Sequence, residues 1–132
     1  MPSVFTRIIR GEEQAWFVWR DDRCVAFLAA TPVRPGHLLV VPIAEVDDWL
    51  DLEDDDAAHL LTVARTLGRA VKSAFAPQRV GLMIAGFDVA HVHLHIVPLE
   101  DPHDLDYDKQ RTDIGAAELD TVRSRILDAI AP

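Results

Sequence analysis

The stretch His91–Val97, HVHLHIV, places three of the six histidines of the chain on alternate residues. Side chains of an extended strand alternate between two faces, so the three imidazoles would share one face of a strand. Val92, Leu94 and Ile96 would pack on the opposite face. We expect the rings to line an accessible site on an antiparallel sheet, with His93 at its centre because it has a histidine on each side.

An imidazole at the centre of such a cluster can act as a nucleophile or carry a proton near neutral pH. Its state depends on the partner of its second ring nitrogen, which a neighbouring imidazole could supply. The cluster is hard to explain as packing alone, because each buried ring needs a hydrogen-bond partner. The pattern therefore favours a functional site.

A zinc site is the main alternative, since neutral imidazole is the commonest zinc ligand. Several H-x-H metal sites belong to all-β barrels or to TIM barrels of about 250 residues. This chain has 132 residues and a long helical pattern over Asp55–Phe75. His95 is also followed by Ile-Val-Pro, which supplies no metal-binding aspartate. The zinc hypothesis stays open, but no metal or other cofactor is expected.

Composition limits the class of protein. The hydrophobic fraction of 49% and the charged fraction of 27% are ordinary for one folded domain. The net charge of −9 argues against a nucleic-acid polymer as partner and favours a small phosphate-bearing molecule. Cys24 is the only cysteine, which excludes an internal disulfide. Without a signal-like N-terminus or a long apolar run, we expect a cytoplasmic protein with no membrane partner.

The remaining patterns alternate between strand and helix. A short helix is expected from the N-cap Ser3 to the stop at Gly11, and the long helix has a 3.6-residue apolar period. Strands are predicted over Ala15–Trp19, Cys24–Ala29, His37–Ile43, Arg79–Gly86 and His91–Leu99. An acidic loop over 100–115 and an amphipathic helix over Ala116–Ala131 follow. This layout predicts an α+β domain with a largely antiparallel sheet.

HVHLHIV resembles the His-φ-His-φ-His-φ-φ motif of the histidine triad (HIT) superfamily, where φ is an apolar residue. VFTRIIRGEEQAWFVWRDDRCVAFLAATPVRPGHLLVVP is similar to the N-terminal half of these proteins, with F-x-x-I-I-x-G, an acidic turn, A-F and P-x-x-P-G-H-x-L-V-x-P in order. The resemblance implies a single Hint-like domain over residues 1–132, with a core over 1–100 and an acidic loop and helix over 101–132. It implies a HIT-like α+β fold: a five-stranded, mainly antiparallel sheet with a long helix, a short N-terminal helix and a C-terminal helix.

The resemblance also implies a metal-independent, phosphoramidase-like nucleotide hydrolase or transferase, usually a homodimer. Its substrates would be nucleoside phosphoramidates, phosphates or dinucleoside polyphosphates. His93 would attack the α-phosphorus and form a covalent nucleotidyl-histidine that water resolves. His91 and His95 would orient His93, bind the phosphate and help to protonate the leaving group. His37 would complete the cluster beside His91.

Residues that match the substrate-binding positions of the family are Phe5, Ile8, Phe27, Asp88 and Val89. The first three match the apolar purine cleft, and they would also be reasonable core residues. The last two come from the segment before the triad that holds the phosphate in the family.

Three positions depart from the family pattern. Ala29 stands where Hint-type members carry a ribose-binding aspartate, Asp88 stands at a serine position, and Glu45 replaces a histidine. A carboxylate at position 88 would repel phosphate, unless it orients a histidine or points to solvent. A nucleotide-binding regulatory protein with little turnover is therefore a further hypothesis. Residues expected at the surface or in packing and dimer contacts are His59, His103, Trp16, Trp19 and Trp49.

Overall fold

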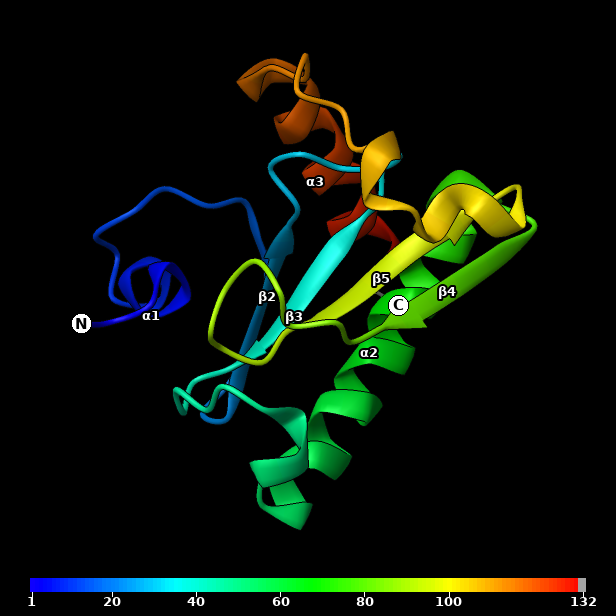
Figure 1. The fold of residues 1–132 in the computed structure, drawn as a ribbon. Coiled ribbons are helices and arrows are strands. Elements are labelled where there is room, and N and C mark those ends of the chain that lie inside the picture. Colours follow the sequence, from blue (N-terminus) through cyan, green and yellow to red (C-terminus); the bar gives the residue numbers. More distant parts are fainter. Residues whose placement is uncertain (131–132) are drawn as a thin grey trace.

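The computed structural model describes residues 1–130, so Ala131, the last residue of the expected C-terminal helix, lies outside the described residues. Within residues 1–130 the chain runs through five strands, three α-helices and three short 3-10 helices, and Figure 1 shows their arrangement. In order these are α1 (Val4–Ile9), β1 (Phe17–Arg20), β2 (Cys24–Leu28), β3 (Leu38–Pro42), η1 (Trp49–Asp51), α2 (Asp54–Phe75), β4 (Arg79–Met83), β5 (Leu94–Leu99), η2 (Pro102–Leu105), η3 (Tyr107–Lys109) and α3 (Ala116–Ile130).

All five strands join one sheet in the order β1-β2-β3-β5-β4, and every neighbouring pair is antiparallel. The expected α+β architecture, with its five-stranded sheet and three helices, is confirmed. The local signals explain the helix ends. Ser3 caps α1 by accepting from the backbone of Thr6, and three aspartates occupy the first turn of α2, where the helix dipole favours negative charge.

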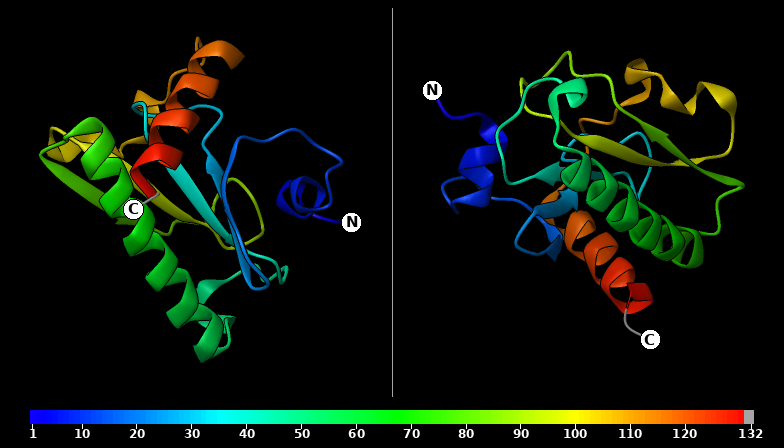
Figure 2. Two further views of the ribbon diagram at one scale, coloured as in Figure 1. Left: turned by 180° about the vertical axis from the view of Figure 1, so that it is seen from behind. Right: turned by 90° about the horizontal axis from the view of Figure 1, so that it is seen from below.

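Helices lie on both faces of the sheet (Figure 2). One face packs against α2 and α3, and residues 24, 26, 28, 38, 40, 94 and 96 of β2, β3 and β5 point into this larger core. The intervening positions of β2 and β3 meet α1 on the other face. This smaller cluster consists of Phe5, Ile8, Val25, Phe27 and Val41. Helix α1 therefore sits on the face of the sheet to which His95 belongs.

Strand β5 begins at Leu94 rather than at His91, which corrects the predicted strand over His91–Leu99. The backbone before Leu94 finds partners outside the ladder. The N–H of Val92 donates to the carbonyl of Val46 at 2.7 Å, and the carbonyl of His91 accepts from a histidine ring. The pairing of β5 with β3 ends at Val40 and Leu94. The segment His91–His93 is thus an irregular entry to the strand.

The acidic segment after β5 is more ordered than the expected loop, because it contains η2 and η3. Asp104 is 1% exposed and accepts hydrogen bonds from the backbone N–H groups of Glu100 and Asp101 and from the side chains of Arg34 and Lys109. These donors, the Glu100 backbone foremost, hold the pKa of the Asp104 carboxyl below its usual range. This carboxylate ties the segment to the turn before β3.

The turn between β1 and β2 is held by Asp21. Its carboxylate accepts from the backbone of Arg23 and Cys24, from the indole of Trp19 and from the ring of His59 on α2, which lies 2.7 Å away. His59 is therefore half-buried and hydrogen-bonded rather than a free surface residue as expected. Burial, with the nearby Asp21 charge, raises the pKa of the Cys24 thiol to about 12. None of the helices among residues 1–130 is long and apolar enough to span a membrane.

Candidate active site

The register between β3 and β5 decides which histidines meet. Leu39 lies opposite His95 in this antiparallel pair, so His37 at the start of β3 lies beside His95. The two rings are joined by a 3.0 Å contact between Nε2 of His37 and Nδ1 of His95. This corrects the expectation that His37 would lie beside His91. The turn before it needs Gly36, which has a φ of 102° and no room for a Cβ against Phe75.

The hydrogen bonds fix the tautomers of this pair. Nδ1 of His37 accepts from the backbone N–H of Val33 at 3.1 Å, so the proton of the neutral ring is on Nε2. That proton is donated to Nδ1 of His95, which leaves the proton of the neutral His95 ring on its own Nε2. Burial lowers the pKa of His37 to about 3 and that of His95 to about 4, with a further contribution from neighbouring histidines. His95 is therefore a neutral donor through Nε2.

His93 is oriented by the backbone rather than by a neighbouring imidazole. Its Nδ1 lies 2.8 Å from the carbonyl of His91, and because a carbonyl only accepts, Nδ1 carries a proton. The lone pair of the neutral ring is therefore on Nε2. Oδ1 of Asp88 lies 3.1 Å from this Nε2, and that hydrogen bond requires a proton between the two atoms. Asp88 thus contacts a histidine, one of the roles left open by the sequence.

His91 uses both of its ring nitrogens to hold its own position. Nε2 lies 2.8 Å from the carbonyl of Pro42 at the end of β3, and Nδ1 lies 2.7 Å from the hydroxyl of Ser3. Burial lowers the pKa of His91, which favours the neutral ring. The contact from His91 to His93 is thus made by the His91 carbonyl, while both nitrogens of the His91 ring have partners elsewhere.

The expectation of accessible rings was wrong in one respect. The histidines at 37, 91, 93 and 95 are all at most 2% exposed. Phe5 covers the rings of both His91 and His93, with its centroid 4.9 Å from that of His93. The rings are enclosed because α1 packs on this face of the sheet. Access is therefore through the cavities that adjoin His93 and His95.

One such cavity, of about 240 Å³, lies between α1 and the sheet. It brings together all five predicted substrate-binding residues and adds His95 to them. The five predicted residues that line it are Phe5, Ile8, Phe27, Asp88 and Val89. The apolar walls come from α1 and β2, whereas Asp88 and His95 mark a polar end. From the sequence, these five residues were linked only by the resemblance to the family. In the structure they line one cavity.

The same cavity includes residues that the sequence analysis missed or assigned elsewhere. Ala29 lines it, so no carboxylate stands at the family's ribose position. Gln14 and Gln110 contribute polar groups instead. Trp16, expected in packing or dimer contacts, lines the cavity and also donates from its indole to Asp120 at 2.8 Å. No motif pointed to Gln14, Trp16 or Gln110 as lining residues, because all three lie outside the helices and strands.

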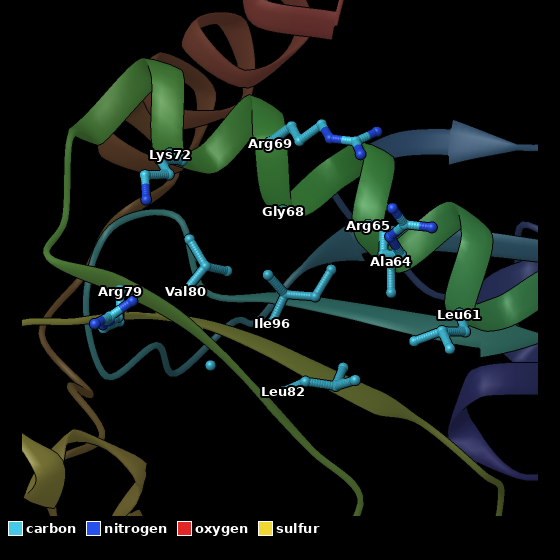
Figure 3. Close-up of a pocket in the computed structure, with 11 residues that line it drawn as sticks. Leu61, Ala64, Arg65, Gly68, Arg69, Lys72, Arg79, Val80, Leu82 and Ile96 are labelled. Atoms are coloured by element: carbon cyan, nitrogen blue, oxygen red, sulfur yellow. The ribbon is translucent and has the colours of Figure 1, made fainter.

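Two other hollows lie away from this cavity. A space of about 390 Å³ adjoins His93 from the side of Asp48, Trp49 and Gly86. A groove of about 370 Å³ between α2 and strands β4 and β5 is lined by leucines and by several cations, and no histidine lines it (Figure 3). We place the chemistry at the histidines rather than in the groove, because no histidine, cysteine, serine, threonine or carboxylate is among the residues that line the groove.

Among the described residues, two clusters have the composition of a metal site. The nearest ligand atoms of Asp88, His93 and His95 all lie within 4.8 Å of one another, as do those of Asp21, Cys24 and His59. The second cluster suits a metal poorly, because the Cys24 thiol has a raised pKa and Asp21 is already occupied by several donors. The first cluster keeps the zinc hypothesis testable.

Comparison with known proteins assigns the chain to a family. A model of the HIT domain matches residues 10–101. An uncharacterized HIT-like protein of Saccharolobus solfataricus is 36% identical over 100 residues, which cover 72% of each chain. The chain therefore belongs to the HIT domain family.

Solved structures agree with this assignment. A HIT-like protein of Bartonella henselae is 26% identical, with a TM-score of 0.83 over 96% of this chain and 95% of that one. A hypothetical histidine triad nucleotide-binding protein of Sulfolobus tokodaii is 27% identical, with a TM-score of 0.85 over 96% of this chain and 91% of that one. The similarity extends over nearly the whole fold, including the segments that follow the triad.

We expect the free energy of unfolding to decrease as the pH falls below 6.5. His37 and His95 stay neutral in the folded protein, with pKa values of about 3 and 4, whereas histidines of the unfolded chain have the ordinary pKa of 6.5 and take up protons as the pH falls below it. The unfolded state then binds more protons, so stability rises with pH and is lost as pH falls through this window. At about pH 5 the loss from His37 alone is on the order of 1–2 kcal/mol.

Urea unfolding at about pH 7.5, 6 and 5 measures this dependence. The His37→Gln variant should show a shallower decline than the wild type, because one of the groups that resist protonation is gone. Equal declines in the two proteins would contradict the assignment of neutral, buried rings.

Proposed function

We propose that this protein is a HIT-type nucleotidyl hydrolase that cleaves nucleoside phosphoramidates without a metal ion. The observation that carries the proposal is the hydrogen bond from Nδ1 of His93 to the His91 carbonyl, which leaves Nε2 as the nucleophilic atom. The similar Sulfolobus tokodaii protein is described as nucleotide-binding, which supports a nucleotide as substrate. The cytoplasmic location expected from the sequence stays a prediction.

The nucleotide would lie in the cavity between α1 and the sheet. Its base would pack between Phe5, Ile8 and Phe27, whose apolar and aromatic surfaces suit a flat ring. Its α-phosphate would then lie at the polar end, near His95 and Asp88. With Ala29 at the family's ribose position, the sugar would be held without a carboxylate.

The reaction would proceed in two displacements. Nε2 of His93 attacks the α-phosphorus while the P–N bond to the leaving amine breaks. The Nε2–H of His95 donates to a nonbridging oxygen, where negative charge develops. The amine takes up the proton that His93 and Asp88 share, with Asp88 carrying it away from Nε2. Water then attacks the phosphorus, the bond from phosphorus to Nε2 of His93 breaks, and the proton lost by the water returns to the His93–Asp88 pair as the nucleoside monophosphate is released.

Asp88 supports an amine as the leaving group. Its carboxylate lies 3.1 Å from Nε2 of His93, and its side chain is 52% exposed, so it stands where the substrate must enter. Once Asp88 has released the shared proton, its negative charge disfavours a polyphosphate leaving group, which brings several further negative charges. An amine brings none, and it can accept the proton. The departure from the family pattern thus favours phosphoramidates over dinucleoside polyphosphates.

Substitution of the nucleophile should abolish the reaction. We expect His93→Gly to remove measurable turnover of an adenosine phosphoramidate such as AMP amide, because no other side chain can form the covalent intermediate. His103→Ala is the matched control, since this histidine is exposed on η2 and lies outside the cavity. The measurement is AMP release under single-turnover and steady-state conditions.

Other outcomes of the same experiment identify the competing hypotheses. Equal rates in His93→Gly and wild type would refute the nucleophile assignment. Tight nucleotide binding by a wild type that releases no AMP would indicate a regulatory protein. Stoichiometric zinc in the purified protein, together with loss of activity on chelation, would indicate a metal site at Asp88, His93 and His95.

Asp88→Asn should change the substrate preference. Without the carboxylate, we expect the ratio of kcat/KM for diadenosine polyphosphate over AMP amide to rise by roughly fivefold, the equivalent of about 1 kcal/mol for a charge pair at about 4 Å in a solvated setting. Parallel assays of both substrates at one pH and ionic strength measure this ratio. A ratio that stays constant would contradict the proposed role of the charge.

We also propose that the chain forms a homodimer through β4 and α2. Strand β4 is an edge of the sheet, and it pairs only with β5 among residues 1–130. Leu61 and Leu82 are 48% and 47% exposed beside the groove shown in Figure 3. An open strand edge with exposed leucines favours pairing with a second copy.

Light scattering should then give twice the chain mass of 14.7 kDa. We expect Leu82→Lys to give monomers, because it adds a charge to a groove already lined by Arg65, Arg69, Lys72 and Arg79. Leu50→Lys is the matched control, since Leu50 is 71% exposed and lies outside this groove. A monomeric wild type would overturn the proposed dimer.

A further inference from the structure

A polar cluster outside the proposed reaction steps meets the ring of the first triad histidine. Oε1 of Glu45 accepts from the backbone N–H of Ser3 at 2.7 Å and from the hydroxyl of Thr6 at 2.6 Å. The hydroxyl of Ser3 in turn lies 2.7 Å from Nδ1 of His91. These contacts join α1, the segment after β3 and the triad, which are far apart in the sequence.

The chemistry of each partner gives the direction of these bonds. The Pro42 carbonyl can only accept, so Nε2 of His91 carries the proton and donates to it. Nδ1 of the neutral ring must then accept, and the Ser3 hydroxyl is the donor. The oxygen of that hydroxyl also accepts from the backbone N–H of Thr6 at 3.0 Å. Ser3 therefore serves as a helix cap and as a donor to His91 at once.

The backbone carbonyl of His91 connects these contacts to His93. Residue 91 is held on one side by Ser3 and on the other by Pro42, and its carbonyl accepts from Nδ1 of His93 at 2.8 Å. A fixed ring at 91 fixes the direction of that carbonyl. The carbonyl determines which nitrogen of His93 carries the lone pair.

We propose that Glu45 and Ser3 are positioning residues of the active site. Glu45 holds the first turn of α1, so that the Ser3 hydroxyl keeps His91 in its neutral Nε2–H form and keeps the His91 carbonyl on His93. The same anchoring places Phe5, which lies on α1, against the ring of His93. The kinetic part of this inference rests on the proposed function, whereas the state of the His91 ring does not.

A pair of Ser3 variants separates the donor role from the capping role. Aspartate and asparagine are both good N-caps, so both variants keep α1. The asparagine amide can still donate to Nδ1, whereas an aspartate carboxylate can only accept. We expect Ser3→Asp to convert His91 to the doubly protonated ring at neutral pH, and Ser3→Asn to keep the Nε2–H form. Two-dimensional ¹H–¹⁵N spectra of protein with ¹⁵N-labelled histidine distinguish the two states.

A pair of Glu45 variants tests the anchor through kinetics. Glu45→Ala removes the acceptor, and we expect kcat for AMP amide to fall on the order of tenfold, the scale at which partners that orient a functional histidine act, with little change in KM. Glu45→Gln keeps an acceptor oxygen at the same length and should recover most of the rate. Circular dichroism and thermal unfolding verify that each variant is folded.

The outcomes are distinct. A neutral Nε2–H ring of His91 in Ser3→Asp, or a wild-type kcat in Glu45→Ala, would overturn the positioning role. If His91 responds as expected while no form of the protein, the wild type included, cleaves AMP amide, the proposed function fails and the control of His91 by Ser3 stands. A loss of rate in Glu45→Gln equal to that in Glu45→Ala would also count against the anchor.

Discussion

The hydrogen bond between Nδ1 of His93 and the carbonyl of His91 is the interaction on which the rest of the site depends. It exists only because β5 starts late. If the ladder continued to His91, that carbonyl would be directed along the sheet, and no ring two residues on could reach it in the same way. Because the strand begins irregularly, the His91 carbonyl becomes part of the site. The surrounding contacts stabilise this irregular segment.

Burial sets the protonation states around this bond. The rings of His37, His91 and His95 are neutral because charging them inside the fold costs desolvation energy, and each has its hydrogen-bond partners arranged for the neutral form. The apolar packing of α1 on the sheet thus helps to keep these rings neutral. In the proposed reaction, charge developing on a phosphoryl oxygen would meet the oriented Nε2–H of the neutral His95 ring.

The sequence predicted most of the fold and the position of the histidine cluster, because these depend on local patterns. Period-two alternation placed the strands, a 3.6-residue period placed α2, and the HVHLHIV motif located the cluster. The pairing of His37 with His95 depends on the register between two distant strands, which no local pattern encodes. The bond from Ser3 to His91 spans 88 residues, and from sequence Ser3 is recognised only as a helix cap. Tertiary contacts of this kind required the folded chain.

The single thiol of the chain has a practical consequence. Cys24 is fully buried on β2, and its raised pKa leaves almost none of it as thiolate at neutral pH. Alkylating reagents and oxidants therefore meet an unreactive sulfur for as long as the sheet is intact. The rate at which such a reagent modifies Cys24 therefore measures how often the domain opens globally, and mass spectrometry can follow this rate.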